Sequence, residues 1–192
     1  MPSLSLQPLF LKPHPGSTPG CIDAIQVSLS SRSPGAQLSH LDASELKLTY
    51  VLSGDTSKLR IPAPTAATRA DGLWQHTCCE AFIRAEGSPA YIEINFSPSG
   101  QWQVYAFTDY RLGSLIKPVA APQIECSVEP GRLTLTATLQ SADLPPGNTL
   151  HIGLTAVLEN TSGDMAYWAL QHAAGKPDFH HPDTFALELE WP

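Results

Sequence analysis

Hydrophobic and polar residues alternate with a period of two along much of this chain. Segment 45–52 carries Leu46 and Leu48 at alternate positions, and segment 132–139 alternates leucine or alanine with threonine. Because successive side chains on a strand point to opposite faces, this pattern predicts strands with one buried and one exposed face. No segment has the clear spacing of an amphipathic helix. The pattern therefore favours an all-β fold.

Turn-forming residues separate these strands at short intervals. The chain contains 18 prolines and 13 glycines, which are typical of the turns between short strands. We predict about ten or eleven strands in an antiparallel β-sandwich of two sheets, with a jelly-roll or immunoglobulin-like arrangement. The predicted strands span residues 4–11, 21–30, 45–52, 78–84, 90–97, 101–107, 123–128, 132–139, 150–159 and 184–189, and two weaker candidates span 57–62 and 167–170.

Three consecutive strands predicted within residues 71–110 carry polar groups inside apolar runs. Isoleucine and phenylalanine occupy the even positions of segment 91–96, whereas tyrosine, Glu93 and Asn95 occupy the odd positions. The even positions predict a core face. The odd positions, together with Glu80 on the preceding strand, predict a face that meets either solvent or a bound ligand.

Size and charge limit the classes of function. A chain of 192 residues is long enough to form one domain with its own core, which we place at residues 1–192. The formal net charge of −7 excludes nucleic acid as a partner, and scattered lysine and arginine exclude an anionic membrane surface. No apolar segment approaches the ~20 residues of a membrane span, and the N-terminus lacks the pattern of a secretory signal. We therefore expect a cytoplasmic protein.

The C-terminal segment is rich in side chains that can bind metals. It contains His172, Asp178, His180, His181 and Asp183. Their spacing matches no standard zinc pattern, so we predict no bound metal. Such imidazoles commonly cap backbone groups in a loop or contact a ligand. This segment is the second candidate region for a site.

Several motifs in order resemble the DOMON-like domains and the related family nine of carbohydrate-binding modules. Trp74 is followed by the sequence CEAF at 79–82, YIEINF at 91–96, PSG at 98–100 and the aromatic strand 102–107. The tail from Tyr167 to Leu189 resembles the C-terminal signature of small bacterial DOMON-like proteins. The resemblance implies a β-sandwich that binds sugars in some members and haem in others.

The same resemblance implies a non-enzymatic site for a sugar or a similar polyhydroxylated small molecule. In the carbohydrate-binding relatives two tryptophans flank the sugar, and Trp74 and Trp168 are the candidates here. An aromatic plane packs against the C–H face of a sugar ring, while charged and amide groups bond its hydroxyls. The candidates for these hydrogen bonds are Glu80, Glu93, Asn95 and Arg111, with His172, His180 and His181 at the rim.

Two other functions remain open at this point. A haem-binding electron-transfer domain would use Met165 with His172 or His181 as axial ligands. An enzyme would use a metal or the carboxylate pair Glu80 and Glu93, as glycoside hydrolysis does. The sequence contains no nucleophile elbow, phosphate loop, dinucleotide fingerprint or zinc-protease helix. The identity of the ligand and the oligomeric state are not specified by the sequence.

Overall fold

The structure, a computed structural model, describes residues 7–17, 20–32 and 45–191. Within these residues, twelve strands and four short 3-10 helices account for the regular structure, which confirms the all-β class. The strands are β1 (Leu9–Pro13), β2 (Ile22–Arg32), β3 (Glu45–Gly54), β4 (Cys78–Ala85), β5 (Tyr91–Phe96), β6 (Trp102–Phe107), β7 (Leu115–Ile116), β8 (Gln123–Glu129), β9 (Arg132–Gln140), β10 (Thr149–Glu159), β11 (Met165–Ala169) and β12 (Leu187–Glu190). The helices are η1 (Thr56–Lys58), η2 (Leu73–Gln75), η3 (Ser141–Asp143) and η4 (Pro182–Thr184), and none is long and apolar enough to cross a membrane.

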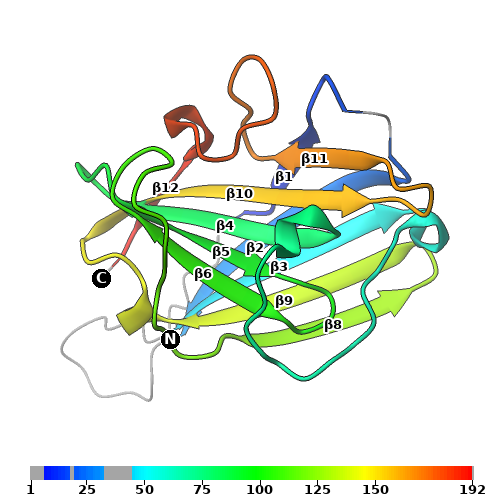
Figure 1. Cartoon of the computed structure of the whole chain (residues 1–192), viewed down its shortest axis with the longest axis horizontal. Coiled ribbons are helices and arrows are strands. Elements are labelled where there is room, and N and C mark those ends of the chain that lie inside the picture. Colours follow the sequence, from blue (N-terminus) through cyan, green and yellow to red (C-terminus); the bar gives the residue numbers. More distant parts are fainter. Residues whose placement is uncertain (1–6, 18–19, 33–44, 192) are drawn as a thin grey trace.

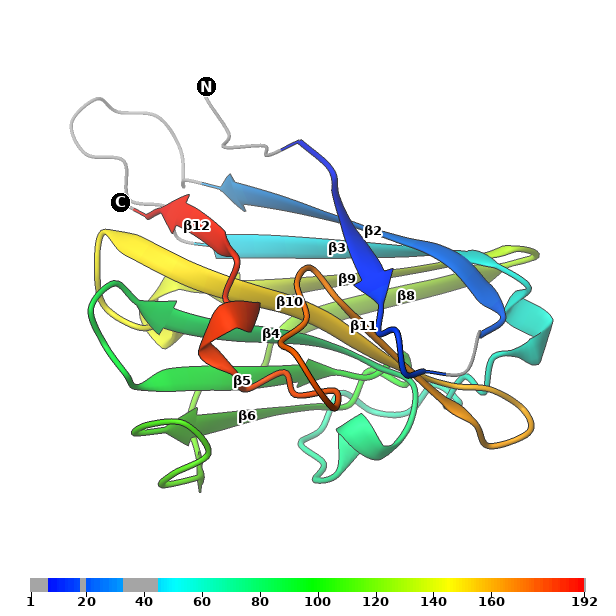
Figure 2. The same ribbon diagram turned by 90° about the horizontal axis from the view of Figure 1, so that it is seen from above.

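The strands pair antiparallel in one continuous order, β7-β6-β5-β4-β10-β11-β1-β2-β3-β9-β8, and β12 pairs with the other end of β10. We call β2, β3, β9 and β8 the first arm, and β7, β6, β5, β4, β10 and β11 the second arm. Figure 1 shows the strands of the second arm side by side. Figure 2 shows the two arms as separate layers.

Strand β1 joins the two arms into one curled sheet. Its residues Leu9–Leu11 pair with β2, and Lys12 and Pro13 pair with β11. Figure 2 shows β1 running from one layer towards the other. The predicted division into two separate sheets with a jelly-roll or immunoglobulin-like arrangement is therefore not confirmed.

Several predicted strand limits change because local turn chemistry prevails over the alternating pattern. Around the predicted strand 57–62 the chain forms η1, since the Asp55 carboxylate accepts a hydrogen bond from the Ser57 backbone N–H. The predicted strand 184–189 becomes the end of η4 followed by β12. The first six residues of the chain, including the start of the predicted strand 4–11, lie outside the described residues.

The main core lies between the two arms. Alternate side chains of both arms point inward and form one buried cluster, as the period-two pattern requires. On β3 these are Leu46, Leu48 and Tyr50, as predicted, and on β5 they are the isoleucines and Phe96. The Tyr50 hydroxyl donates a hydrogen bond to the Glu80 backbone carbonyl at 2.7 Å, so the one polar atom of this side chain is satisfied.

The outer face of the second arm carries a second apolar cluster, which the segment between β11 and β12 covers. Phe179 and Phe185 of that segment pack with Phe82 on β4. Gly153 of β10 permits this approach, because a Cβ there would lie 3.0 Å from the Thr184 carbonyl oxygen. Strand β5 is consequently buried on both faces along its whole length.

Candidate functional site

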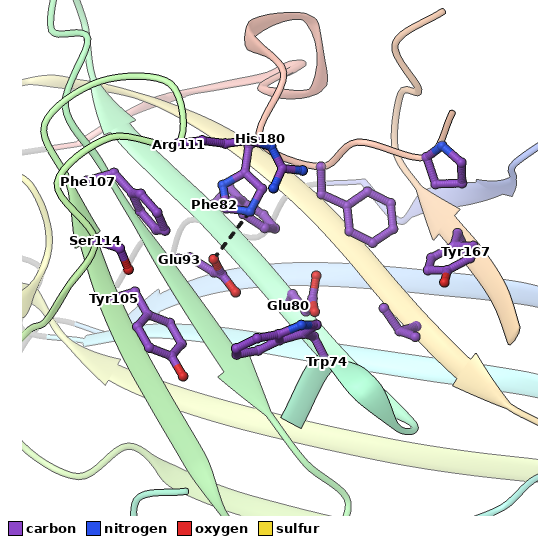
Figure 3. Close-up of a pocket in the computed structure, with 13 residues that line it drawn as sticks. Trp74, Glu80, Phe82, Glu93, Tyr105, Phe107, Arg111, Ser114, Tyr167 and His180 are labelled. Atoms are coloured by element: carbon purple, nitrogen blue, oxygen red, sulfur yellow. Dashed lines mark ion pairs between the residues drawn. The ribbon is translucent and has the colours of Figure 1, made fainter. Parts of the chain in front are cut away.

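A cavity of about 450 Å³ opens on the outer face of the second arm (Figure 3). Strands β4, β5, β6, β10 and β11 form its floor, and η2, the loop after β6 and the segment after β11 form its walls. It is lined by Trp74, Glu80, Phe82, Glu93, Tyr105, Phe107, Arg111, Ser114, Val157, Tyr167, Pro177, Phe179 and His180.

The strand register places the two carboxylates on the cavity face. Glu93 of β5 lies between its cross-strand partners Phe82 and Tyr105. Glu80 of β4 pairs with Thr155 of β10 on its other side. Directly paired residues of neighbouring strands point to the same face of a sheet, so these five side chains share one face, and all of them except Thr155 line the cavity.

Glu80 is buried in the floor, with only 2% of its surface exposed. Its Oε2 atom accepts a hydrogen bond of 3.0 Å from the Thr155 hydroxyl. Burial, and secondarily the negative charge of Glu93, raise the pKa of Glu80 to about 8, which outweighs the opposing effect of the Thr155 hydrogen bond. At neutral pH the free protein therefore holds Glu80 mainly as a neutral acid.

Glu93 is also buried, at 6% exposure, and Asn95 holds it in place. Asn95 Nδ2 donates a hydrogen bond of 2.8 Å to Glu93 Oε1, and the Cys78 thiol contacts Asn95 Oδ1 at 3.7 Å. Burial raises the pKa of Glu93, although the Asn95 hydrogen bond and the positive charge of Arg111 oppose the shift. Asn95 itself does not line the cavity; it orients the carboxylate from the next position on the same face of β5.

A chain of polar contacts links Glu93 to the wall. The Tyr91 hydroxyl accepts from the Arg111 backbone N–H at 3.2 Å and lies 2.8 Å from His180 Nδ1. Burial, with a smaller effect from Arg111, lowers the pKa of His180 to about 4, so the ring is neutral at neutral pH. A neutral ring that accepts the Tyr91 proton at Nδ1 carries its own proton on Nε2, which lies 3.6 Å from Glu93 Oε2. The contact that is dashed in Figure 3 is therefore polar rather than ionic at neutral pH.

Asp178 links the loop after β6 to the segment after β11, and these two segments form the upper wall. Its carboxylate accepts hydrogen bonds from Arg111 Nη2 at 2.7 Å and from the Tyr110 hydroxyl at 2.5 Å. Burial tends to raise the pKa of Asp178, but these two hydrogen bonds and the charge of Arg111 prevail and lower it. Arg111 is the one non-glycine residue with a positive φ, 54°, among the described residues. Its guanidinium is engaged with the Asp178 carboxylate.

Trp74 forms the lower wall and remains 42% exposed. Gly72 precedes helix η2 as its N-cap, and its φ of 72° lies in the left-handed region that favours glycine. The indole of Trp74 meets the Tyr105 ring edge to face, with 5.7 Å between centroids. The Tyr105 hydroxyl in turn donates to Asp71 at 2.9 Å, which fixes the ring against which the indole rests. An apolar surface is therefore presented beside the two carboxylates.

The structure brings together five of the nine residues predicted from the sequence for a ligand site. Trp74, Glu80, Glu93, Arg111 and His180 line the same cavity. That they bind a ligand stays a prediction.

The other predicted residues lie elsewhere, and Trp168 needs correction. Its side chain is only 4% exposed and belongs to the core between the arms, because Tyr167, not Trp168, occupies the position of β11 that faces the cavity. Trp168 is therefore no candidate for stacking on a ligand.

Neither His172 nor His181 lines the cavity. His172 Nε2 donates to the Lys12 carbonyl at 2.8 Å and ties the tail to β1. His181 precedes η4 and its Nδ1 accepts from the Asp183 backbone N–H at 3.2 Å, which is a capping role. Met165 borders a separate, much smaller cavity beside Gly20. The residues predicted as haem ligands are therefore absent from the lining of the large cavity.

Sequence reasoning missed several residues that line the cavity. Tyr105 and Phe107 could have been found, because the short turn before β6 sets the register that places Tyr105 opposite Glu93. Phe179 carries no such signal, since the segment around it has no periodicity and its place depends on packing against β4. In the part of the chain that the structure describes, no three His, Cys, Asp or Glu side chains come together as a metal site.

Comparisons with known proteins identify similar folds but no sequence family. A candidate carbohydrate-binding protein from Bacteroides uniformis is 15% identical over 99% of this chain and 87% of its own, with a TM-score of 0.68. A family nine carbohydrate-binding module from Caldicellulosiruptor kristjanssonii, solved with cellotriose, is 11% identical over 88% of this chain and 74% of its own, with a TM-score of 0.48. A family nine module from the same organism, solved with glucose, is 10% identical over 95% of this chain and 84% of its own, also with a TM-score of 0.48.

No protein-family model matches the chain, and no curated protein matches it. The likeness to the Bacteroides protein shows a common fold. Membership of the DOMON-like family stays a prediction.

Proposed function

We propose that this protein is a non-enzymatic binder of a carbohydrate or a similar polyhydroxylated small molecule. The observation that carries the proposal is the single cavity in which an exposed indole, that of Trp74, stands beside the buried carboxyl groups of Glu80 and Glu93. A ligand there meets an apolar wall and a polar floor at the same time.

The chemistry of this cavity suits a sugar. The C–H face of a sugar ring can pack on the Trp74 indole and the Tyr105 ring, which already lie edge to face. Its hydroxyls can accept from the neutral acid of Glu80 and donate to Glu93. Arg111, held by Asp178, supplies a further donor at the upper wall. A volume of about 450 Å³ lies within the range of small-molecule sites.

The fold shared with the candidate carbohydrate-binding protein from Bacteroides uniformis supports the proposal. We extend the same proposal to a relation with DOMON-like domains and family nine modules, on the motifs from Trp74 to Phe107. A binder needs a preformed site but no nucleophile, and the polar groups here are already fixed by Thr155, Asn95 and Asp178.

Calorimetric titration across a panel of neutral and charged monosaccharides and disaccharides tests this function. We expect saturable binding to the wild type and a loss of about tenfold or more in affinity for Trp74→Ala, because the stacking surface is removed. Phe10→Ala is the matched control, since Phe10 is an exposed aromatic residue on β1 that does not line the cavity.

Two results would contradict the proposal. One is the absence of binding by every member of the panel. The other is equal affinity of the wild type and Trp74→Ala for a sugar that does bind. A disaccharide recovered intact after incubation would agree with a role without catalysis.

A further inference from the structure

The cavity holds more acidic than basic groups that are available to a ligand. Among its thirteen lining residues, the acids are Glu80 and Glu93, and the one permanent cation is Arg111. The Arg111 guanidinium already bonds the Asp178 carboxylate at 2.7 Å. The other basic group, His180, is neutral at neutral pH, because burial keeps its pKa low. The two acids therefore face the cavity without a dedicated cationic partner.

Glu80 retains unused hydrogen-bonding capacity. It is buried, yet within the described residues the one hydrogen bond to its carboxyl group comes from Thr155 to Oε2. A carboxylate can accept about four hydrogen bonds. Figure 3 shows Glu80 and Glu93 in the middle of the side chains drawn around the cavity. Both acids line the cavity, so a ligand can reach them.

The side chains around the two acids are largely aromatic. They include Trp74, Phe82, Tyr105, Phe107, Tyr167 and Phe179. The face of an aromatic ring attracts a cation, and the attraction grows when the cation is desolvated. The two acids and the rings around them favour the same kind of group, which is an ammonium ion.

We propose that the ligand is an amino sugar, or another polyhydroxylated amine, whose ammonium group binds at Glu80 and Glu93. This inference rests on the proposed function, because the hydroxyl groups of the same ligand occupy the remainder of that site. A neutral sugar would bring no counter-charge to Glu93 and would leave Glu80 protonated. An ammonium group supplies three donors and a positive charge in one place.

Binding of such a cation also moves a proton. In the free protein, burial and the charge of Glu93 keep Glu80 mainly protonated at neutral pH. An ammonium ion beside the pair favours the charged form of both acids, so Glu80 releases its proton to the buffer as the complex forms. The titratable and charged groups near the pair are Arg111, His180, Tyr91, Tyr105 and Cys78, and the Thr155 hydroxyl bonds Glu80. None of these groups needs to change its charge in this step.

The test compares glucosamine with glucose and N-acetylglucosamine by calorimetry at about pH 6.5, where an amine of ordinary pKa is protonated. We expect glucosamine to bind about tenfold more tightly than the two neutral sugars, as a charge-assisted hydrogen bond allows. Titrations in two buffers of different ionisation enthalpy should show release of about one proton with glucosamine and none with glucose.

Variants of the two acids test which residues cause the preference for glucosamine. Glu80→Gln keeps the shape of the neutral acid and should remove both the preference for glucosamine and the proton release. Glu93→Gln is the second variant, and Glu125→Gln, an exposed position on β8, is the matched control that should retain both properties. Thermal unfolding of each variant checks that it is folded.

Each outcome decides the inference. Equal or tighter binding of glucose, still sensitive to Trp74→Ala, would overturn the preference for an amine and leave the proposed function standing. A preference for glucosamine that survives in both Glu80→Gln and Glu93→Gln would overturn the assignment to these acids. The absence of binding by any sugar would overturn the proposed function as well.

Discussion

The two arms of the sheet have the same strand chemistry but different surroundings. In the first arm, β9 alternates strictly between buried and partly exposed residues, and threonines occupy the outer positions. In the second arm, β5 is buried at every position, because the segment after β11 and the loop after β6 cover its outer face. The threonines Thr49 and Thr136 can bond each other and also meet water, whereas Glu93 and Asn95 cannot rely on water.

The difference in burial between the two arms shows which polar residues indicate a function. A threonine on a half-exposed strand stabilises little and needs no special partner. A carboxylate on a strand buried on both faces is costly unless it is paired. Glu80 and Glu93 lie in such a place and are fixed by Thr155 and Asn95, which suits a prepared site better than a plain core.

The largest expected effect comes from removing the partner of a buried acid. Asn95→Ala takes away the donor to Glu93 Oε1 and should lower the free energy of unfolding by about 3 kcal/mol, as for a lost hydrogen bond to a buried charge. Thr136→Ala, in the first arm, should cost less than about 1 kcal/mol. Urea denaturation of both variants measures the difference, and equal losses would show that the arms do not differ in this way.

A smaller effect concerns the pH dependence of stability. Because the folded-state pKa of Glu80 is raised to about 8, the folded protein binds more protons than the unfolded chain between the ordinary glutamate pKa of 4.5 and about 8, so stability falls as pH rises through this range. Below about pH 6.5 the lowered pKa of His180 opposes this trend, since a buried neutral histidine gains stability as pH rises.

From about pH 6.5 to 8 the opposing effect of His180 is absent, so the change in stability reports the buried acids, and Glu80→Gln separates the share of Glu80 from that of Glu93, whose pKa is also raised. We expect the free energy of unfolding to fall there by about 1.5 kcal/mol in the wild type, since one pKa unit corresponds to about 1.4 kcal/mol. Glu80→Gln should be nearly independent of pH over the same interval. A wild type and a variant with the same slope would contradict the buried neutral acid.

The smallest effect concerns the segment after β11 and the loop after β6, which cover the outer face of the second arm. Asp178→Ala removes the bonds from Arg111 and Tyr110 and should cost about 1 kcal/mol of stability, discounted because both partners are partly exposed. Sugar affinity should fall a few-fold, because Arg111 loses its fixed position. Asp183→Ala, an exposed acid of the same segment, is the control for thermal unfolding and calorimetry. No change in affinity would mean that the contacts of Asp178 with Arg111 and Tyr110 do not shape the site.

Much of the fold follows from local pattern, and parts of it do not. The alternation in segment 45–52 predicts β3 and its buried face, and the odd and even positions of β5 separate core from site as expected. The double pairing of β1 is invisible in the sequence, because it depends on where a chain of five residues meets two other strands.

The residues of the candidate site that lie on strands could be predicted from the sequence. Glu80 and Glu93 stand out because each is an acid within an otherwise apolar strand. The face of the sheet to which each points follows from the alternation of side chains along a strand. Trp168 was a candidate only through its position near the C-terminus, and its place in the core could not be predicted, because the face to which it points depends on how β11 pairs with β10. Phe179 lies in a segment without periodicity, and tertiary packing alone sets its place.

The most direct test maps ligand contacts on the free protein by NMR titration with glucosamine and glucose, following the backbone amides and the Trp74 indole N–H. We predict shifts at Trp74, Glu80, Glu93 and Arg111 that saturate with ligand, while β8 and β9 of the first arm stay unchanged. Shifts confined to the first arm, or saturable binding that leaves the Trp74 indole and both glutamates unaffected, would contradict a sugar site on the outer face of the second arm.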